Sequence, residues 1–257
     1  MNDKKVIIYK QARTAAENAS IDFEVKILHV LENKIQTCLI PQVLDYSVSD
    51  LYAFSYEQIS GVTLSAEFYK NTSNEMQDLL AQDLAGFFFE LHHALSISDA
   101  SKLGIVKADW PFDAAWLSQR LKNVLQEDWL KKLFENFIQK YTAINFESLD
   151  IVVLHHDMHG GNILCNQATG RLQGIIDFAD VSIGDPYLDF RLLWLIDKKL
   201  AQKVAFYYAQ KYLKPVDLDR IEFYYLATEF SRFAQALEDN EKSHTIASIK
   251  ERLNKIL

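Results

Sequence analysis

Two short apolar runs, each followed at once by polar residues, limit how this chain can fold. Ile151–Leu154 is followed by a loop from His155 to Asn162, and Leu172–Ile176 is followed by Asp177. Apolar runs of this length, bounded by turn residues such as Asn166–Gly170, predict buried strands. The sequence therefore predicts two strands that deliver a polar loop and a further carboxylate.

The residue types in these two places predict phosphoryl transfer. The loop reads H-x-D-x-x-x-x-N, with Asp157 and Asn162 at its key positions, and Asp177-Phe178 follows. Phosphoryl transfer needs a group that orients a hydroxyl, and it needs oxygen ligands for Mg²⁺. We expect Asp157 to accept the hydroxyl proton, and Asn162 and Asp177 to hold the metal.

Two other interpretations use the same residues. Asp, Gly and Asn between strands are commonly plain turn residues, although the joint spacing of Asp157, Asn162 and Asp177 argues against that. A zinc-dependent hydrolase is the second, because four neighbouring side chains are possible zinc ligands: His155, His156, Asp157 and His159. The remaining histidines form no further ligand cluster: His29, His92, His93 and His244.

Three motifs in order resemble the aminoglycoside phosphotransferase family, the kinase-like small-molecule phosphotransferases. They are the loop containing Asp157, then Ile176–Asp180 (IDFAD), then Asp185–Asp189 (DPYLD). The longer pattern is nearest the aminoglycoside 2″-phosphotransferase type. The resemblance implies an α+β, protein-kinase-like fold of two lobes, with a small β-rich lobe at 1–60 and a mainly helical lobe at 61–257.

The resemblance also implies roles for named residues. It makes Asp157 the catalytic base and makes Asn162 and Asp177 the metal ligands, as the residues themselves suggest. His155 and Asp189 then support the catalytic loop, with Asp189 acting through His155.

The front of the chain is interpreted through the same resemblance. A strand at Val6–Tyr9 leads to Lys10, and Glu24 lies in a predicted helix at Ala15–Glu32. In kinase-like folds a strand lysine contacts the nucleotide phosphates and pairs with a helix glutamate. Solvated surface charges are the alternative for both residues. Backbone from Tyr56 to Ile59 is the expected contact for the nucleotide base.

One family feature is missing. A glycine-bearing hairpin over the phosphates should precede Lys10, yet only nine residues stand there and the first glycine is Gly61. Three explanations are open for the missing hairpin: a coding sequence that starts upstream of Met1, a shortened kinase that still works, or a degenerate member that binds nucleotide without catalysis. A hairpin loss would remove backbone donors from the phosphates.

The acceptor site is predicted less directly. The resemblance places the acceptor over the catalytic loop and the helices that follow, where Asp180, Glu229 and Glu238 are candidate contacts for ammonium groups. Acidic residues on a late helix usually only form a solvated face.

Thr72 with Glu75 predicts a capping box at the start of a helix with a long apolar face.

Composition narrows the class of protein. The chain has 257 residues and a net charge of −8, which disfavours nucleic acid and suits a cationic substrate. Apolar runs are too short for a signal peptide or membrane span, and the two cysteines, Cys38 and Cys165, form no framework. We expect a cytoplasmic localisation.

The sequence thus predicts a small-molecule O-phosphotransferase that uses ATP or GTP and Mg²⁺ on an aminoglycoside-like acceptor. Choline, fructosamine and homoserine remain alternative acceptors. A nucleotide-binding pseudokinase is the non-enzymatic alternative.

Overall fold

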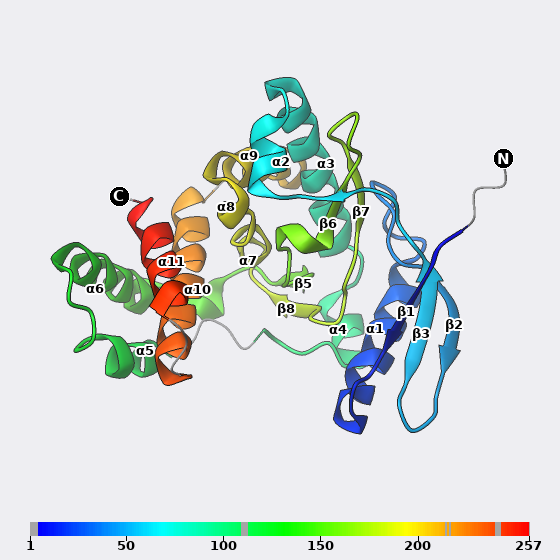
Figure 1. The fold of residues 1–257 in the computed structure, drawn as a ribbon, viewed down its shortest axis with the longest axis horizontal. Helices are drawn as coiled ribbons and strands as arrows, with labels where there is room; N and C mark the ends of the chain where they lie inside the picture. The colour runs from blue at the N-terminus through cyan, green and yellow to red at the C-terminus, as the bar shows by residue number, and fades with distance from the viewer. Residues whose placement is uncertain (1–4, 109–112, 214, 216, 240–242, 257) are drawn as a thin grey trace. The chain divides into compact units, whose positions relative to one another are not determined.

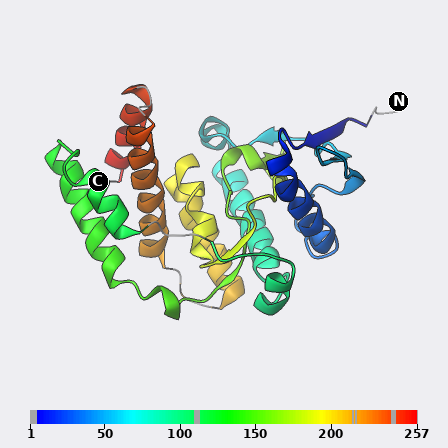
Figure 2. The same ribbon diagram turned by 90° about the horizontal axis from the view of Figure 1, so that it is seen from below.

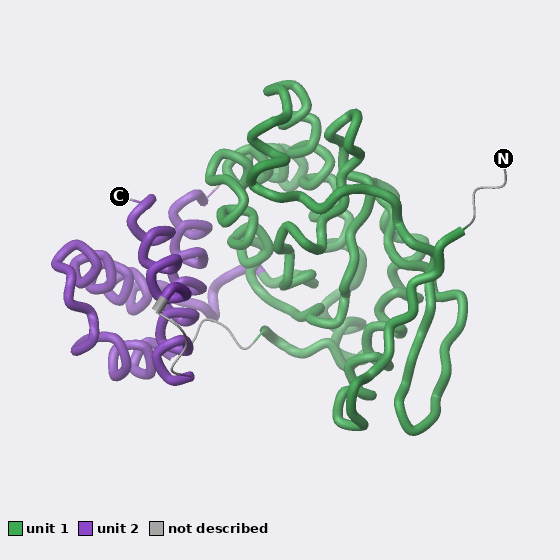
Figure 3. Tube along the Cα trace, in the orientation of Figure 1, with its two compact units in different colours: residues 1–108, 151–216 green, residues 109–150, 217–257 purple. Residues whose placement is uncertain are grey.

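The computed structural model describes the chain except residues 1–4, 109–112, 214, 216, 240–242 and 257. It forms two compact units, which Figure 3 colours separately. Unit 1 comprises residues 1–108 and 151–216, and unit 2 comprises residues 109–150 and 217–257. The lobe boundary expected after residue 60 falls inside unit 1 and stays a prediction.

Unit 1 begins with a three-stranded antiparallel sheet and one helix (Figure 1). The strands are β1 (Ile7–Gln11), β2 (Val43–Ser47) and β3 (Ala53–Glu57), in the order β1-β3-β2. Helix α1 (Asn18–Leu31) packs on β2 and β3 through a face that alternates at helical spacing. The strand and the helix expected around Lys10 and Glu24 are therefore confirmed.

Two small sheets carry the polar loops. One contains β4 (Val62–Thr63), β6 (Ile163–Cys165) and β7 (Leu172–Ile175), and the other pairs β5 (Val152–Leu154) with β8 (Ser182–Gly184). β5, β6 and most of β7 are buried, as their apolar composition predicts. The two expected strands are present, but they lie in different sheets.

Helices fill the rest of unit 1, and the longest two, α3 and α9, pack against each other. The helices are α2 (Ala66–Asn71), α3 (Asn74–His92), α4 (Ile97–Lys102), α7 (Tyr187–Phe190), α8 (Leu193–Ile196) and α9 (Lys198–Tyr212).

The capping box expected from Thr72 and Glu75 is wrong. Ser73 caps α3, because its hydroxyl accepts a hydrogen bond from the Met76 N–H at 3.2 Å. The Thr72 hydroxyl instead donates to the Tyr69 carbonyl at 2.7 Å and so closes the end of α2.

Unit 2 is helical and has an aromatic core. Its helices are α5 (Ala114–Leu121), α6 (Asp128–Ala143), α10 (Leu218–Glu238) and α11 (Ser243–Asn254), and Figure 2 shows α10 (orange) beside α11 (red). The rings of Phe137 and Phe223 are stacked 5.2 Å apart between α6 and α10. In the part of the chain that the structure describes, no helix combines the length and apolar character needed to cross a bilayer.

Candidate active site

A fully buried carboxylate, Asp189 on α7, holds the start of the loop that contains Asp157. One Asp189 oxygen accepts the backbone N–H of His155 at 3.0 Å, and the other accepts that of His156 at 2.7 Å. Burial alone would raise the pKa of Asp189, but the hydrogen bond and charge of His92, with the backbone N–H of His156, lower it. An ionised carboxylate therefore fixes the loop through its backbone.

The His155 side chain joins this loop to the end of β7. Its imidazole is buried, lies 3.2 Å through Nε2 from the Ile176 carbonyl oxygen, and packs with its ring centre 4.7 Å from that of Phe178. Burial lowers the pKa of His155, which favours the neutral ring.

His156 adopts a left-handed backbone conformation with φ of 71°, which is uncommon for a residue with a side chain. Its carbonyl accepts a hydrogen bond from Arg191 at 2.8 Å. Burial and, to a smaller extent, the Arg191 charge lower the pKa of His156 to about 4. Backbone strain of this kind concentrates at functional sites.

Asp157 and Asn162 lie at the two ends of one short loop and are hydrogen-bonded to each other. The Asn162 amide donates to the Asp157 backbone carbonyl at 2.9 Å and to its carboxylate at 3.2 Å. Gly160 is required between them, because a Cβ there would collide with the Leu64 carbonyl oxygen. The Asp157 side chain is 33% exposed, so its carboxylate can reach a bound molecule.

Lys10, Glu24 and Asp177 form a second cluster. Lys10 Nζ lies 2.6 Å from Glu24 and 2.8 Å from Asp177, and the Phe178 N–H donates to Glu24 at 3.1 Å. Burial would lower the pKa of Lys10, but the Glu24 charge and the hydrogen bonds to Asp177 and Glu24 raise it. The Lys10 ammonium group thus joins Glu24 on α1 to Asp177, which lies 167 positions after Lys10 in the sequence.

The two clusters meet at the ends of β6 and β7. The Ile176 N–H donates to the Asn162 carbonyl at 3.1 Å, and Asp177 follows directly with φ of 67°. Both hydrogen bonds of the Asn162 side chain use its amide nitrogen, so its side-chain oxygen is the atom left to bind a metal, and the Asp177 side chain is 44% exposed. An amide oxygen beside a carboxylate fits Mg²⁺, which prefers hard oxygen ligands and keeps several waters.

The same residues give no support to the zinc alternative. Within the described residues, no three His, Cys, Asp or Glu side chains gather into a possible metal-binding group. His159 is exposed and lies 3.5 Å through Nε2 from the Asp157 carboxylate, while His155 faces the Ile176 carbonyl.

Asp180 adds a further negative charge to this region. Its side chain is exposed, yet partial desolvation and the negative charges of Asp157 and Asp177 raise the pKa of its carboxyl. A cation near Asp180 would therefore be attracted by three carboxylates.

The expected base contact, Tyr56 to Ile59, spans the end of β3. Tyr56 pairs with Ile8 on β1 and Val43 on β2, whereas Ile59 is buried beyond the strand. The missing side chain of Gly174 on β7 makes room for Ile59, since a Cβ there would lie 2.6 Å from Ile59 Cγ2.

The two other acidic candidates lie in unit 2, on α10, and both are ion-paired. Glu229 has 0% exposed side chain and contacts Arg252 at 2.8 Å and Arg232 at 3.4 Å. Glu238 pairs with Arg120. An acceptor could reach Glu229 only by displacing these arginines, so its expected role stays a prediction without geometric support.

Sequence reasoning missed two buried residues behind Asp189: His92, which contacts its carboxylate, and Tyr208, which contacts His92. His92 Nε2 lies 3.1 Å from the Asp189 carboxylate, and His92 Nδ1 lies 2.8 Å from the Tyr208 hydroxyl. The available signal was the position of His92 on the apolar face of α3, because a buried polar side chain requires a partner.

The model of the phosphotransferase enzyme family (APH) matches residues 2–224 of the chain.

Several solved structures share the fold. An aminoglycoside 2'-phosphotransferase-IIIa in its GDP complex superposes with a TM-score of 0.81 at 19% identity, covering 97% of this chain and 85% of that one. The streptomycin–ATP complex of APH(2")-IIa gives 0.66 at 22% identity, covering 98% and 86%. A macrolide 2'-phosphotransferase type I gives 0.68 at 18% identity, covering 98% and 84%. The expected kinase-like α+β fold is confirmed.

Proposed function

Because the chain belongs to the phosphotransferase enzyme family, we propose that it transfers the γ-phosphoryl group of a nucleoside triphosphate to a hydroxyl group of a small molecule. The observation that carries this proposal is the meeting of two clusters at adjacent strand ends: Asp157 with Asn162, and Lys10 with Glu24 and Asp177. Phosphoryl transfer depends mainly on positioning and charge stabilisation, which such a cluster provides.

Asp157 acts as the base in this proposal. Its carboxylate is part-exposed and is held in place by the Asn162 amide, 3.2 Å away. A carboxylate so placed can orient an acceptor hydroxyl and take its proton as the bond to phosphorus forms. The Asp189 contacts to His155 and His156 keep the loop from moving during that step.

Lys10 binds the nucleotide phosphates, and Glu24 keeps its ammonium group in position through the 2.6 Å pair. Asn162 and Asp177 would hold Mg²⁺, which neutralises phosphate charge when bound. Asp177 now contacts Lys10 at 2.8 Å, so we infer that nucleotide and metal binding loosen this contact. The backbone from Tyr56 to Ile59 is proposed to contact the base.

We propose a cationic acceptor of the aminoglycoside type. The support is the acidic cluster of Asp157, Asp177 and Asp180, with the similarity to structures whose complexes contain kanamycin, streptomycin and gentamicin. Asp180 is the proposed acceptor contact, because it is exposed and negative. Choline, fructosamine, homoserine and macrolides are the competing acceptors, and the screen below separates them.

The test is a screen for acceptor-dependent nucleotide consumption. ATP and GTP are each supplied with Mg²⁺ and a panel of aminoglycosides, macrolides, choline, fructosamine and homoserine, and the phosphorylated product is identified by mass spectrometry. We expect one acceptor class to give turnover that disappears with EDTA and in Asp177→Ala, while Asp45→Ala, an exposed β2 variant, behaves as wild type.

Turnover that persists in Asp177→Ala would contradict the metal-ligand assignment. No acceptor-dependent turnover with either nucleotide would contradict the phosphotransferase proposal and favour a protein that only binds nucleotide.

A further inference from the structure

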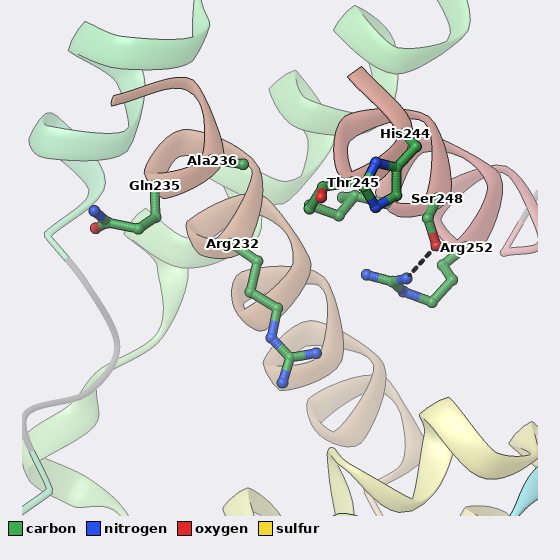
Figure 4. Close-up of a pocket in the computed structure, with 8 residues that line it drawn as sticks. Arg232, Gln235, Ala236, His244, Thr245, Ser248 and Arg252 are labelled. Atoms are coloured by element: carbon green, nitrogen blue, oxygen red, sulfur yellow. Dashed lines mark hydrogen bonds between the residues drawn. The ribbon is translucent and has the colours of Figure 1, made fainter. Parts of the chain in front are cut away.

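A groove between α10 and α11 in unit 2 is lined mainly by cationic and polar side chains. Its volume is about 400 Å³, within the usual range for small-molecule sites. Figure 4 labels seven of the residues that line it: Arg232, Gln235 and Ala236 from α10, and His244, Thr245, Ser248 and Arg252 from α11. Ile249 from α11 lines it as well.

The groove is positively charged at its rim. Arg232 and Arg252 keep 46% and 30% of their side chains exposed, and His244 is exposed beside them. No Asp or Glu is found among the described residues that line it. Next to the groove, the Asp239 carboxylate accepts a hydrogen bond from the lining residue Gln235 at 2.9 Å.

A buried carboxylate beneath the rim holds both arginines. Glu229 accepts from Arg252 Nε at 2.9 Å, and its other oxygen lies 3.4 Å from Arg232. Arg252 also donates to the Ser248 hydroxyl at 2.8 Å, as Figure 4 shows. The guanidinium of Arg252 is therefore fixed in orientation, and that of Arg232 is held by a longer contact.

The buried ion pairs of Glu229 are an unfavourable way to stabilise the packing of α10 against α11. A buried ion pair is often no more stabilising than apolar residues of similar volume, because both charges must leave water. Here one carboxylate also serves two arginines, so the cluster keeps an excess positive charge that faces the groove. Buried groups that orient exposed ones are a usual support for binding sites.

The floor of the groove is apolar. Ala236 and Ile249 are both 2% exposed and lie beneath the cationic rim. Arginine presents a planar fork of donors that matches the oxygens of carboxylate and phosphate groups. We propose that this groove binds a small organic oxyanion, a molecule with a phosphate or carboxylate group beside an apolar part.

This site is independent of the proposed phosphotransfer, since its residues all belong to unit 2 and none is among the residues assigned to that reaction. The charge of its ligand is also opposite to that of the proposed cationic acceptor.

The test is a titration of the full chain followed by backbone amide NMR. The probes are phenyl phosphate, benzoate and the neutral benzyl alcohol. The signals that report on the groove are the backbone amides of Thr245, Ser248 and Ile249, because these residues line it. They distinguish binding in the groove from binding of a probe elsewhere on the protein. We expect saturable shifts at these amides with an oxyanion and none with benzyl alcohol, and the tighter of the two oxyanions identifies the preferred group.

Two matched variants separate a site from general charge attraction. Arg232→Gln removes one groove charge and should weaken binding about 10- to 100-fold, the range for a charge-assisted hydrogen bond. Lys255→Gln removes one charge after α11, outside the groove, and should bind as wild type. Absence of saturable shifts, equal shifts with benzyl alcohol, or equal losses in both variants would each overturn the proposal.

Discussion

Among the residues that the structure describes, one carboxylate in each unit is completely buried, and the two are held by different kinds of donor. Asp189 in unit 1 accepts two backbone N–H groups, from His155 and His156, and contacts the His92 ring. Glu229 in unit 2 is held by the side chains of Arg232 and Arg252. Both have 0% exposure.

The difference indicates what each carboxylate positions. Backbone donors cannot move without moving the chain, so Asp189 fixes the conformation of the loop that bears Asp157. Side-chain donors keep free N–H groups on their outer edge, so Glu229 fixes the direction in which Arg252 presents its charge. A buried acid can thus organise either main chain or side chains.

The largest expected effects come from neutralising the two carboxylates in parallel. Asp189→Asn places an amide N–H against a backbone N–H, which should cost roughly 1–3 kcal/mol for each donor left unsatisfied. The displaced loop should also lower phosphotransfer about 100-fold, as misplacement by about 1 Å can. Glu229→Gln should destabilise the protein by a similar or smaller amount, because Arg252 is 30% exposed and water can solvate it.

Urea unfolding and nucleotide titration check this pair. We expect Glu229→Gln to leave nucleotide affinity and the NMR signals of residues 155–162 unchanged. Perturbation of those signals in Glu229→Gln, or an undisturbed loop in Asp189→Asn, would remove the distinction.

A smaller effect is expected from the residue behind Asp189. His92→Phe removes the ring nitrogen 3.1 Å from Asp189 and leaves the Tyr208 hydroxyl without its His92 partner, at a cost of about 1–3 kcal/mol. We expect kcat to fall while KM for the nucleotide stays constant, because the loop loosens but Lys10 does not move. His92→Gln, which can still donate to Asp189, should recover part of kcat. Equal losses in Phe and Gln variants would indicate a packing role only.

The smallest effect concerns the pH dependence of stability. The pKa of His156 is lowered to about 4, so between about pH 4 and 6.5 the unfolded chain binds more protons than the folded one. Wild-type stability therefore decreases as pH falls through this window, with His156 contributing about 1–3 kcal/mol. His156→Asn, which tolerates φ of 71°, should show a shallower decrease in thermal unfolding scans. Parallel curves for both proteins would contradict this assignment.

The sequence was sufficient where spacing determines the geometry. Asp157 and Asn162 are five residues apart on one loop, so a local pattern brings them together. The Lys10 contact with Glu24 joins a strand to the following helix, and the kinase-like resemblance was enough to predict that pair.

Other features depended on contacts that no local pattern contains. The sequence predicts Glu229 as a candidate acceptor contact, with a solvated helix face as the alternative, but Glu229 is buried and paired with Arg252 from α11, a helix that the sequence did not suggest. The sequence assigns no role to His92, because its partner Asp189 lies 97 residues away. Thr72 and Ser73 are both acceptable N-cap residues for α3. Thr72 is already the C-terminal cap of α2, so Ser73 caps α3.

The central claim is that Asp157 takes the acceptor proton during phosphoryl transfer. The most direct measurement is a rapid-quench single turnover with γ-labelled nucleotide, Mg²⁺ and the acceptor found by the screen, comparing wild type with Asp157→Ala. The account predicts a transfer rate at least about 100-fold lower in the variant, with nucleotide affinity unchanged. Transfer at the wild-type rate in Asp157→Ala would contradict the account.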